Sequence, residues 1–462
     1  MKNYDVVVIG AGPGGYVAAI RAAQRGARTA VVEYRNLGGV CLNEGCIPTK
    51  TLIHTAELYR KLQNAAEFGI EVRDVRVNVR KMLDRKETVI GINTGGIGAL
   101  FKANGIDLYK GKASIAEAGV VEVNGEKLTA KNTIIATGGR PAQLPGLEFD
   151  GTRVIGSTDA LNLERIPESV VVIGAGALGT EFACIWNAFG AKVTLVEMMP
   201  TILPRSDSEP AKLLERILRK KKIDVRTGTR VEKIERKEDG VTVHFAGGKA
   251  DSVDAEIVLV AIGLQCNSEI VANSPALNIP LGKRGGIPVN DRMESPVPGI
   301  YAIGDVIDRT WLAHGASAEG IVAATNCTGG NAVMDYRVLP ACNFSSPELA
   351  SVGLTEQEAK DQGYTVKTGS FLFAANGRAH TLGSAEGMVK IIGDAATDEI
   401  LGVHILGPEA GEMIAVGALA MRVEGTVEEI ASTIHTHPTL SEALWEAAED
   451  YYGRGIHSKP KK

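Results

Sequence analysis

Nearly uninterrupted apolar runs recur along this chain, and each is followed within two residues by a glycine. Each run is short enough for one strand, and segments long enough for helices separate the runs. Runs of this kind are typical of parallel strands that are buried on both faces. They predict an α/β fold. The clearest runs occupy residues 4–9, 132–136, 169–173, 257–262 and 300–303.

Helices are predicted between and after these strands. Residues 51–68 form one candidate, preceded by Pro48, which suits the first turn of a helix. Residues 212–222 are expected to form an exposed basic helix with a solvated face. In the last quarter of the chain, strands near residues 350–353 and 389–392 alternate with helices. This change of pattern predicts a C-terminal α+β domain.

One strand–loop–helix–strand unit occurs twice. Each copy has a G-x-G-x-x-G loop after its first strand and an acid about 20 residues later, at the end of its second strand. The first glycine makes a tight turn, the second lets the backbone approach a pyrophosphate, and the third packs helix on strand. The phosphates then lie at a helix N-terminus. The copies have Gly10, Gly12, Gly15 and Glu33, and Gly174, Gly176, Gly179 and Glu197.

These two units predict two Rossmann-like domains that bind two dinucleotides. The acids are expected to contact ribose hydroxyls. A carboxylate at Glu197 repels a 2′-phosphate, and the following Met198 and Met199 supply no arginine, so the second site is expected to take NAD rather than NADP. Two alternatives stay open: one copy is a structural repeat without a ligand, or the acids are surface charges.

Two cysteines, Cys41 and Cys46, closely follow the first glycine loop. A regular helix cannot bring them together, because five steps rise roughly 7.5 Å and place the residues on different faces. The segment is therefore expected to turn, which Gly45 permits. Cys46 would lie near a helix N-terminus, where a thiolate is favoured. The pair suggests a redox disulfide, and the alternatives are two free thiols or half of a metal site.

The composition argues against several classes of function. The net charge of −5 over 462 residues gives no reason to expect nucleic acid or an anionic membrane as a partner. No apolar run approaches the roughly 18 residues that span a bilayer. Six cysteines in a chain of this length do not form a disulfide framework. The first strand begins at Tyr4 and leaves no room for a signal peptide, so a cytoplasmic location is expected.

In this order, the motifs resemble those of the flavoprotein disulfide oxidoreductases over the whole chain. The resemblance rests on the cysteine block at residues 38–50, Ala136-Thr137-Gly138, the strand that ends in Asp305, and residues 435–442. It implies FAD at the first glycine loop, NAD at the second, and a homodimer. The implied domains are residues 1–148 with 270–340 for FAD, 149–269 for NAD, and 341–462 for the dimer interface.

Within this family, the chain looks like the branch that oxidises dihydrolipoamide with NAD⁺. Dihydrolipoamide would exchange with Cys41, and Cys46 would contact the flavin. The implied partners are lipoyl domains of 2-oxo acid dehydrogenase or glycine cleavage complexes. The alternatives are an NAD(P)H-dependent reductase of another low-molecular-weight disulfide and a structural subunit of a multienzyme core.

Thiol attack needs a base with a pKa near the working pH, which suits histidine. The family pattern places this base immediately before a proline, which selects His437 over His435, and Glu442 would orient its imidazole. Pro438 is expected to open a helix. In this family the histidine reaches the thiols of the other subunit.

The resemblance also implies cofactor contacts outside the two loops. Lys50 is expected beside the flavin, paired with Glu181 near the nicotinamide, and Asp305 is expected at the ribityl chain. The other implied flavin contacts are Gly39, Val40, Ala113, Thr137, Gly138, Gly139, Leu312, Ala313 and His314, and the other implied NAD contacts are Val231 and Gly263. Residues 262–267, 315–319 and 344–347 depart from the family pattern.

Overall fold

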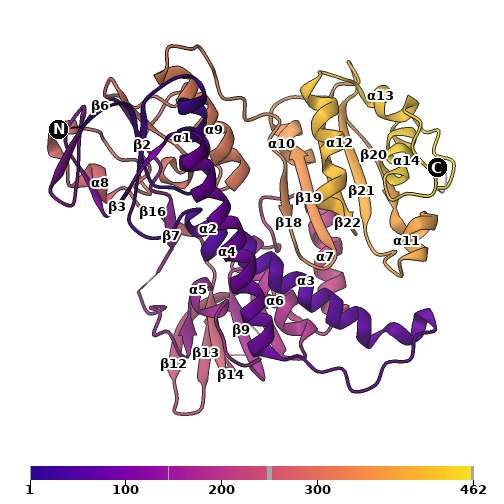
Figure 1. Ribbon diagram of the computed structural model, residues 1–462. Helices are drawn as coiled ribbons and strands as arrows, with labels where there is room; N and C mark the ends of the chain where they lie inside the picture. The colour runs from indigo at the N-terminus through magenta and orange to yellow at the C-terminus, as the bar shows by residue number, and fades with distance from the viewer. Residues whose placement is uncertain (1, 144, 247–251, 459–462) are drawn as a thin grey trace.

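Three sheets with their own helices form three parts of the molecule (Figure 1). The computed structural model describes residues 2–143, 145–246 and 252–458. We call the parts the first, second and third unit, in the order of their sheets along the chain. The first unit holds the N-terminus and the third holds the C-terminus (Figure 1). The predicted α/β fold with an α+β C-terminal part is confirmed.

The first unit contains a seven-stranded sheet covered by two helices that pack side by side. Its strands are β3 (Asp107–Lys110), β2 (Thr29–Glu33), β1 (Lys2–Ile9), β6 (Glu126–Ile135), β5 (Val120–Val123) and β4 (Ala113–Glu117), with β17 (Ile300–Ala302) beside β6. The helices are α1 (Pro13–Gln24) and α9 (Ala313–Cys327). Because β17 and α9 follow the second unit in sequence, the chain leaves the first unit and later returns to it.

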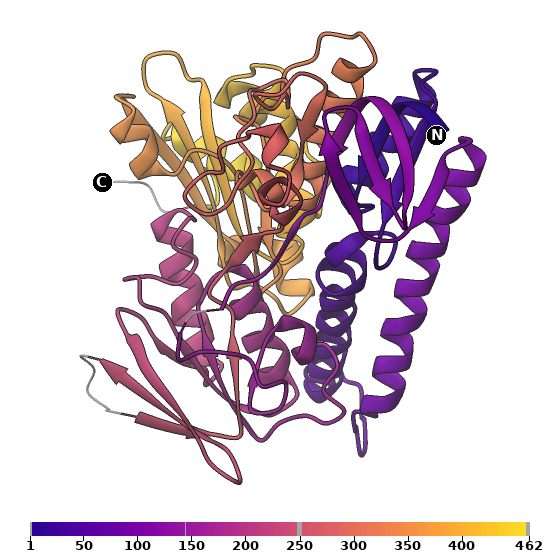
Figure 2. The same ribbon diagram turned by 90° about the vertical axis from the view of Figure 1, so that its left-hand side faces the viewer.

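The second unit repeats this plan with a five-stranded parallel sheet. Its strands are β11 (Asp224–Arg226), β10 (Lys192–Val196), β9 (Ser169–Ile173), β15 (Ile257–Val260) and β8 (Val154–Ile155), and its helices are α6 (Ala177–Ala188) and α7 (Ser208–Lys220). An antiparallel sheet of β12 (Arg230–Arg236), β13 (Val241–Ala246) and β14 (Ser252–Ala255) lies at its lower end (Figure 2). A two-stranded ribbon, β7 (Gly139–Pro141) and β16 (Leu264–Cys266), is formed where the chain enters and leaves this unit.

The third unit is an antiparallel sheet with helices packed on it. The strands, in order, are β18 (Ala341–Asn343), β19 (Glu348–Gly353), β22 (Ile400–Gly407), β21 (Met388–Asp394) and β20 (Val366–Leu372). Its helices are α10 (Glu356–Asp361), α11 (Gly377–Thr381), α12 (Ala410–Arg422), α13 (Val427–Ser432) and α14 (Glu442–Tyr451).

A pair of long helices connects the first unit to the second. They are α3 (Cys46–Gln63) and α4 (Val79–Ala103), preceded by the short helix α2 (Gly39–Asn43). Leu52 and Ile53 of α3 are buried in the core of the second unit, although α3 follows the first glycine loop in sequence. The remaining short helices are α5 (Ser157–Ala160), α8 (Glu269–Ala272), η1 (Ala65–Phe68), η2 (Pro275–Leu277), η3 (Gly304–Ile307) and η4 (Phe373–Ala375).

Three helix predictions need correction. The helix predicted at residues 51–68 begins at Cys46 and ends at Gln63, and η1 follows it as a separate turn. α7 is not only a solvated basic helix, because its Leu214 and Ile217 are buried in the second unit. Pro438 does not open a helix, since α14 begins four residues later.

Across the described residues, every helix is too short or too polar to cross a bilayer.

Candidate active site

In the first glycine loop, two of the three glycines have no room for a side chain, and the third faces open space. A Cβ on Gly10 would lie 2.3 Å from the Ala136 carbonyl oxygen, and a Cβ on Gly15 would lie 2.0 Å from the Gly10 oxygen. A Cβ on Gly12 would meet only the Cα of Gly39, at 3.9 Å. The outer two glycines are therefore required by the chain itself, whereas Gly12 leaves room for an approaching group.

The second loop repeats this arrangement. Cβ atoms on Gly174 and Gly179 would lie 2.4 Å from the Ala261 oxygen and 1.9 Å from the Gly174 oxygen. A Cβ on Gly176 would have no atom within 4 Å. The N-terminus of a helix follows each loop, so both loops fit a pyrophosphate.

The two acids are held in the same way. Glu33 Oε2 accepts the backbone N–H of Ala11 at 2.8 Å, and Glu197 Oε2 accepts that of Ala175 at 2.8 Å. In each case, Oε1 accepts the N–H of the residue two positions further on, at 2.7 and 2.9 Å. Both carboxylates are buried and fixed against their own loop, which is where a ribose next to the pyrophosphate would lie.

The cysteine segment is attached to the first glycine loop. Gly38 donates its N–H to Ala11 O at 2.8 Å, and Cys41 lies one helical turn further on, in α2. The chain then breaks at Gly45, where a Cβ would lie 3.1 Å from the Val40 oxygen, and α3 begins at Cys46. The predicted turn between the cysteines is observed, and Cys46 takes the predicted place at a helix N-terminus.

The two thiols are unequal. Both are free and half-buried, and a side-chain hydrogen bond links them. This bond, with burial, raises the pKa of Cys41. The same bond lowers the pKa of Cys46, and the Lys50 ammonium lowers it further. Cys46 is also the first residue of α3, and this position at a helix N-terminus favours a thiolate there.

Lys50 lies at the meeting point of all three units. Its Nζ is 2.9 and 3.0 Å from the two carboxylate oxygens of Glu181, on α6. Phe344, which follows β18, donates its N–H to the same carboxylate at 3.0 Å, and its ring centroid lies 4.4 Å from Nζ. The expected pairing of Lys50 with Glu181 is observed. Phe344 was not expected here, because only its departure from the family pattern marked it.

Asp305 lies in η3, where burial raises the pKa of its carboxyl to about 6. The neighbouring loop is held by Asn267, whose Nδ2 donates to Thr137 O at 3.0 Å, while Thr137 Oγ1 donates to Asn267 O at 2.7 Å. A Cβ on Gly139 would lie 2.7 Å from the Trp311 ring. A half-buried carboxyl beside this tight loop can accept a ligand hydroxyl, which fits the ribityl chain.

Glu319 is a buried acid to which the sequence gave no role, although it lies in the departing segment 315–319. It accepts the Gly304 N–H at 2.7 Å and the Tyr336 hydroxyl at 2.9 Å, and so holds the start of η3 next to Asp305. A signal was present, because Glu319 is the only acid within the alanine- and glycine-rich sequence of α9. Asn267 was marked only by the departing segment 262–267, and its partner Thr137 lies about 130 residues away.

His437 and Glu442 form a pair in front of α14. His437 Nδ1 lies 2.8 Å from Glu442 Oε1, and Glu442 Oε2 accepts the Thr439 N–H at 2.8 Å. A carboxylate only accepts, so Nδ1 carries the proton and Nε2 is left to take one. The His437 side chain is 78% exposed. The Nδ1 atom of His435 lies 2.9 Å from the backbone oxygen of Thr433 and not beside a carboxylate oxygen.

The thiol pair and the histidine pair lie in different parts of one chain. α2 lies near the centre of the molecule and α14 lies at the outer side of the third unit (Figure 1). Within residues 2–143, 145–246 and 252–458, no hydrogen bond or ion pair joins Cys41 or Cys46 to His437 or Glu442. The two pairs are therefore separate within one chain.

The remaining predicted contacts lie around the two loops or at element ends. Leu312 precedes α9, and Ala313 and His314 are its first residues, with His314 Nε2 2.6 Å from Pro340 O. The others are Val40 in α2, Ala113 at the start of β4, Gly138 before β7, Val231 in β12 and Gly263 before β16.

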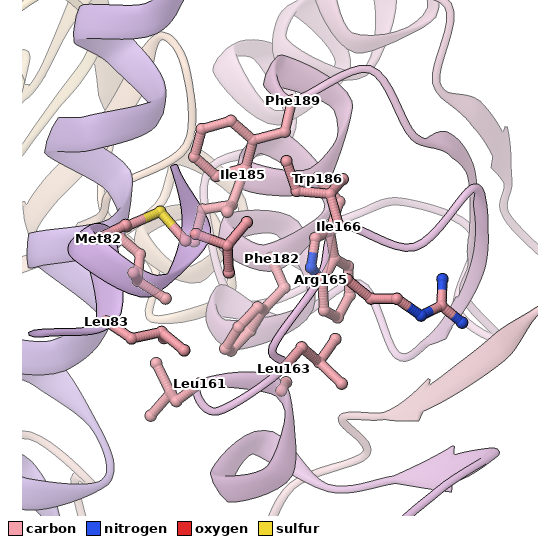
Figure 3. A pocket seen from close by; sticks show the side chains of 13 residues that line it. Met82, Leu83, Leu161, Leu163, Arg165, Ile166, Phe182, Ile185, Trp186 and Phe189 are labelled. Carbon is pink, nitrogen blue, oxygen red and sulfur yellow. The ribbon is translucent and has the colours of Figure 1, made fainter. Parts of the chain in front are cut away.

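An apolar pocket lies elsewhere, between α4 and α6 (Figure 3). Met82, Leu83, Phe182 and Ile185 point into it, and Arg165 lies at its side. Its volume of about 20 Å³ holds at most one water molecule, so it cannot take a cofactor. In the described part of the chain, no group of three or more histidine, cysteine or acidic residues could hold a metal ion.

Comparison with known proteins gives the class of protein. The model of the pyridine nucleotide-disulphide oxidoreductases matches residues 4–320, and the dimerisation domain of the same class matches residues 339–448. The chain therefore belongs to the pyridine nucleotide-disulphide oxidoreductase family, and the resemblance seen in its motifs is confirmed. The dimerisation domain supports a homodimer.

Within the family, dihydrolipoyl dehydrogenases are similar to this chain throughout. Those of Thermus scotoductus and Bacillus subtilis are 46% and 44% identical, and cover 99% and 98% of this chain and 99% of their own. Among solved structures, LpdA from Mycobacterium tuberculosis has a TM-score of 0.89 at 26% identity, over 97% of this chain and 99% of its own. The HOCl-induced flavoprotein disulfide reductase RclA from Escherichia coli has 0.84 at 28% identity, over 96% and 99%.

Proposed function

We propose that this chain oxidises protein-bound dihydrolipoamide to lipoamide and reduces NAD⁺ to NADH. FAD and NAD are its cofactors, as in the dihydrolipoyl dehydrogenases that it resembles over its whole length. The observation that carries the residue assignment is the position of the two thiols beside the first glycine loop, with Cys41 in α2 and Cys46 at the N-terminus of α3. We assign FAD to the loop of Gly10 and NAD to the loop of Gly174.

The cysteine pair exchanges its disulfide with the substrate. A dihydrolipoyl thiolate attacks the Cys41 sulfur of the oxidised pair, the Cys41–Cys46 bond breaks, and Cys46 leaves as a thiolate. The second substrate thiol then displaces Cys41, which closes the lipoamide ring and leaves two electrons in the reduced pair. Lys50 and the N-terminus of α3 stabilise the charge on Cys46. The chemistry that FAD and NAD⁺ supply when bound is the removal of this electron pair as NADH.

His437 takes the proton of the attacking thiol on Nε2, while Glu442 holds Nδ1–H and stabilises the charged ring. The exposure of His437 in one chain supports its action on the thiols of a partner subunit. We also propose that residues 1–148 and 270–340 form the FAD-binding domain, that residues 149–269 form the NAD-binding domain, and that residues 341–462 form the dimer interface. The lipoyl group is expected on a domain of a 2-oxo acid dehydrogenase or glycine cleavage complex.

The test compares two reactions of the purified, flavin-loaded protein. Turnover of dihydrolipoamide with NAD⁺, followed by NADH absorbance, is the expected activity. Turnover of glutathione disulfide with NADPH is the rival activity. A rate with the second pair equal to or above the rate with the first would replace this proposal with a disulfide reductase.

A further inference from the structure

A buried ion-pair cluster joins the second unit to the third. Lys390 on β21 is 2% exposed and Asp207, immediately before α7, is 1% exposed. Lys390 Nζ lies 3.0 Å from Asp207 Oδ1 and 2.6 Å from Oε2 of Glu356, the first residue of α10. Glu209 supplies a third carboxylate at 3.2 Å. Removing such charges from water is costly unless they stay paired, so the cluster favours one fixed docking of the two units.

The Asp207 carboxylate is shared between the units. Oδ1 accepts the Glu209 N–H at 3.1 Å and so caps α7, and Oδ2 accepts the Glu356 N–H of the third unit at 3.0 Å. Burial alone would raise the Asp207 pKa, but the Glu356 N–H and the Lys390 ammonium outweigh it and the pKa is lowered. α7 lies against the lower end of the third sheet, where it contacts β22 and β19 (Figure 1).

Asp207 also ends the segment that follows Glu197. In this segment, Leu203 donates its N–H to Ala175 O at 2.8 Å, and Ser206 donates to Leu203 O at 2.8 Å. Ala175 in turn donates its N–H to Glu197 Oε2. An unbroken series of backbone contacts therefore leads from the second glycine loop to the ion pair.

We propose that Lys390 and Asp207 are positioning residues for NAD⁺. By fixing residues 198–207 to the third unit, they hold Ala175 and Glu197 in the geometry that receives the nucleotide ribose. This inference rests on the proposed assignment of the second loop to NAD⁺. Among the described residues, no hydrogen bond or ion pair joins Lys390 or Asp207 to the thiols or to the first glycine loop. Loss of the ion pair is therefore expected to act on nucleotide affinity and to spare dihydrolipoamide.

The test uses the full-length, flavin-loaded enzyme with Lys390→Met and with the double variant D207N/K390M. We expect the KM for NAD⁺ and the Kd for NADH to rise roughly two- to thirtyfold, the range of mutations that act through a connected network. We expect kcat and the KM for dihydrolipoamide to stay within about twofold of wild type.

Lys360→Met is the matched control. Lys360 pairs with the other oxygen of the same Glu356 carboxylate, but its side chain is 52% exposed. An exposed pair of this kind contributes little, so this variant is expected to bind NADH as the wild type does.

The outcomes separate the inference from the proposed function. Variants that unfold more easily but bind NADH with wild-type affinity would show a purely structural ion pair and overturn the inference. A wild-type enzyme that binds no NADH would overturn the proposed function instead. If Lys390→Met does not fold, D207N/K390M decides, because it leaves neither Asp207 nor Lys390 as an unpaired charge: weakened NADH binding supports the inference and unchanged binding overturns it.

Discussion

The two glycine loops have the same local contacts but lead to different parts of the molecule. Ala11 and Ala175 occupy matching positions, and each carbonyl accepts an N–H from the segment beyond the acid, from Gly38 and Leu203 respectively. After Gly38 the chain forms the thiol pair, whereas after Leu203 it enters the joint with the third unit. The repeated part of each unit therefore provides the nucleotide-binding loop. The segment after each acid differs: it forms the thiol pair in the first unit and the contact with the third unit in the second.

The largest expected effect is on the thiols that follow the first loop. Cys41→Ser removes the sulfur that exchanges with substrate, so dihydrolipoamide–NAD⁺ turnover should fall about a thousandfold or more. Flavin absorbance should persist, because Cys41 is not part of the loop. Cys327→Ser, in the last turn of α9, is the control and should retain turnover. Retained turnover in Cys41→Ser would sink the mechanism.

A loss of similar or smaller size is expected when the base in the third unit is replaced. His437→Gln should lower kcat with dihydrolipoamide by about a hundred- to ten-thousandfold, the usual contribution of a general base. His435→Gln provides the comparison, since the His435 ring hydrogen-bonds to the Thr433 carbonyl rather than to a carboxylate. Steady-state rates of both variants across pH 6 to 9 show which histidine is the base. A larger loss in the His435 variant would identify His435 as the base instead of His437.

Matched substitutions in the two loops test the assignment of FAD to the first loop and of NAD⁺ to the second. Gly12 and Gly176 are the positions where a side chain meets open space, so valine there would fill the room reserved for a pyrophosphate. Gly12→Val should purify with less bound flavin. Gly176→Val should keep its flavin absorbance and raise the KM for NAD⁺ about five- to a hundredfold, as an overpacked contact does. The opposite pattern would exchange the two assignments.

The smallest expected effect is a loss of folding stability at low pH, caused by a histidine near the contact between the second and third units. His404 is buried, and its ring nitrogens lie 3.0 Å from Ser351 Oγ and from Leu354 O. Burial lowers its pKa, although the nearby Asp207 opposes this shift. Because the folded pKa is lowered, its contribution to stability is present above the unfolded value of about 6.5 and is lost as pH falls below it.

Urea unfolding at pH 7.5, 6.5 and 5.5 measures this effect. The wild type should lose up to about 1.4 kcal/mol per pH unit below 6.5 from this group. His404→Gln should show a shallower loss over the same interval. Parallel pH profiles for the two proteins would contradict the prediction.

The local parts of the fold were readable from the sequence, and the long-range contacts were not. The strands, both glycine loops and the turn at Gly45 follow from apolar runs and glycine spacing. The prediction that a helix begins at Pro438 was wrong, because α14 begins at Glu442. The Thr439 N–H donates to the Glu442 carboxylate and holds the preceding segment as a loop.

Residues that hold the site from a distance gave weak signals. Lys390 and Asp207 are separated by 183 positions, and neither stands out in its own segment. Glu319 was present as a lone acid in α9, but only the structure shows that it bonds to Gly304. Such residues are recognised by burial together with charge, and a sequence shows charge alone.

The start of α3 at Cys46 bears on which changes of chain length this molecule can tolerate. Lys50 follows Cys46 by one helical turn, and its ammonium reaches Glu181 in the second unit. One residue inserted between them would rotate everything beyond by about 100° and carry the ammonium off the thiolate's side of the helix. Insertions or deletions are expected to be tolerated instead in the mostly exposed segment between η1 and α4, where they would not change the position of Lys50 relative to Cys46.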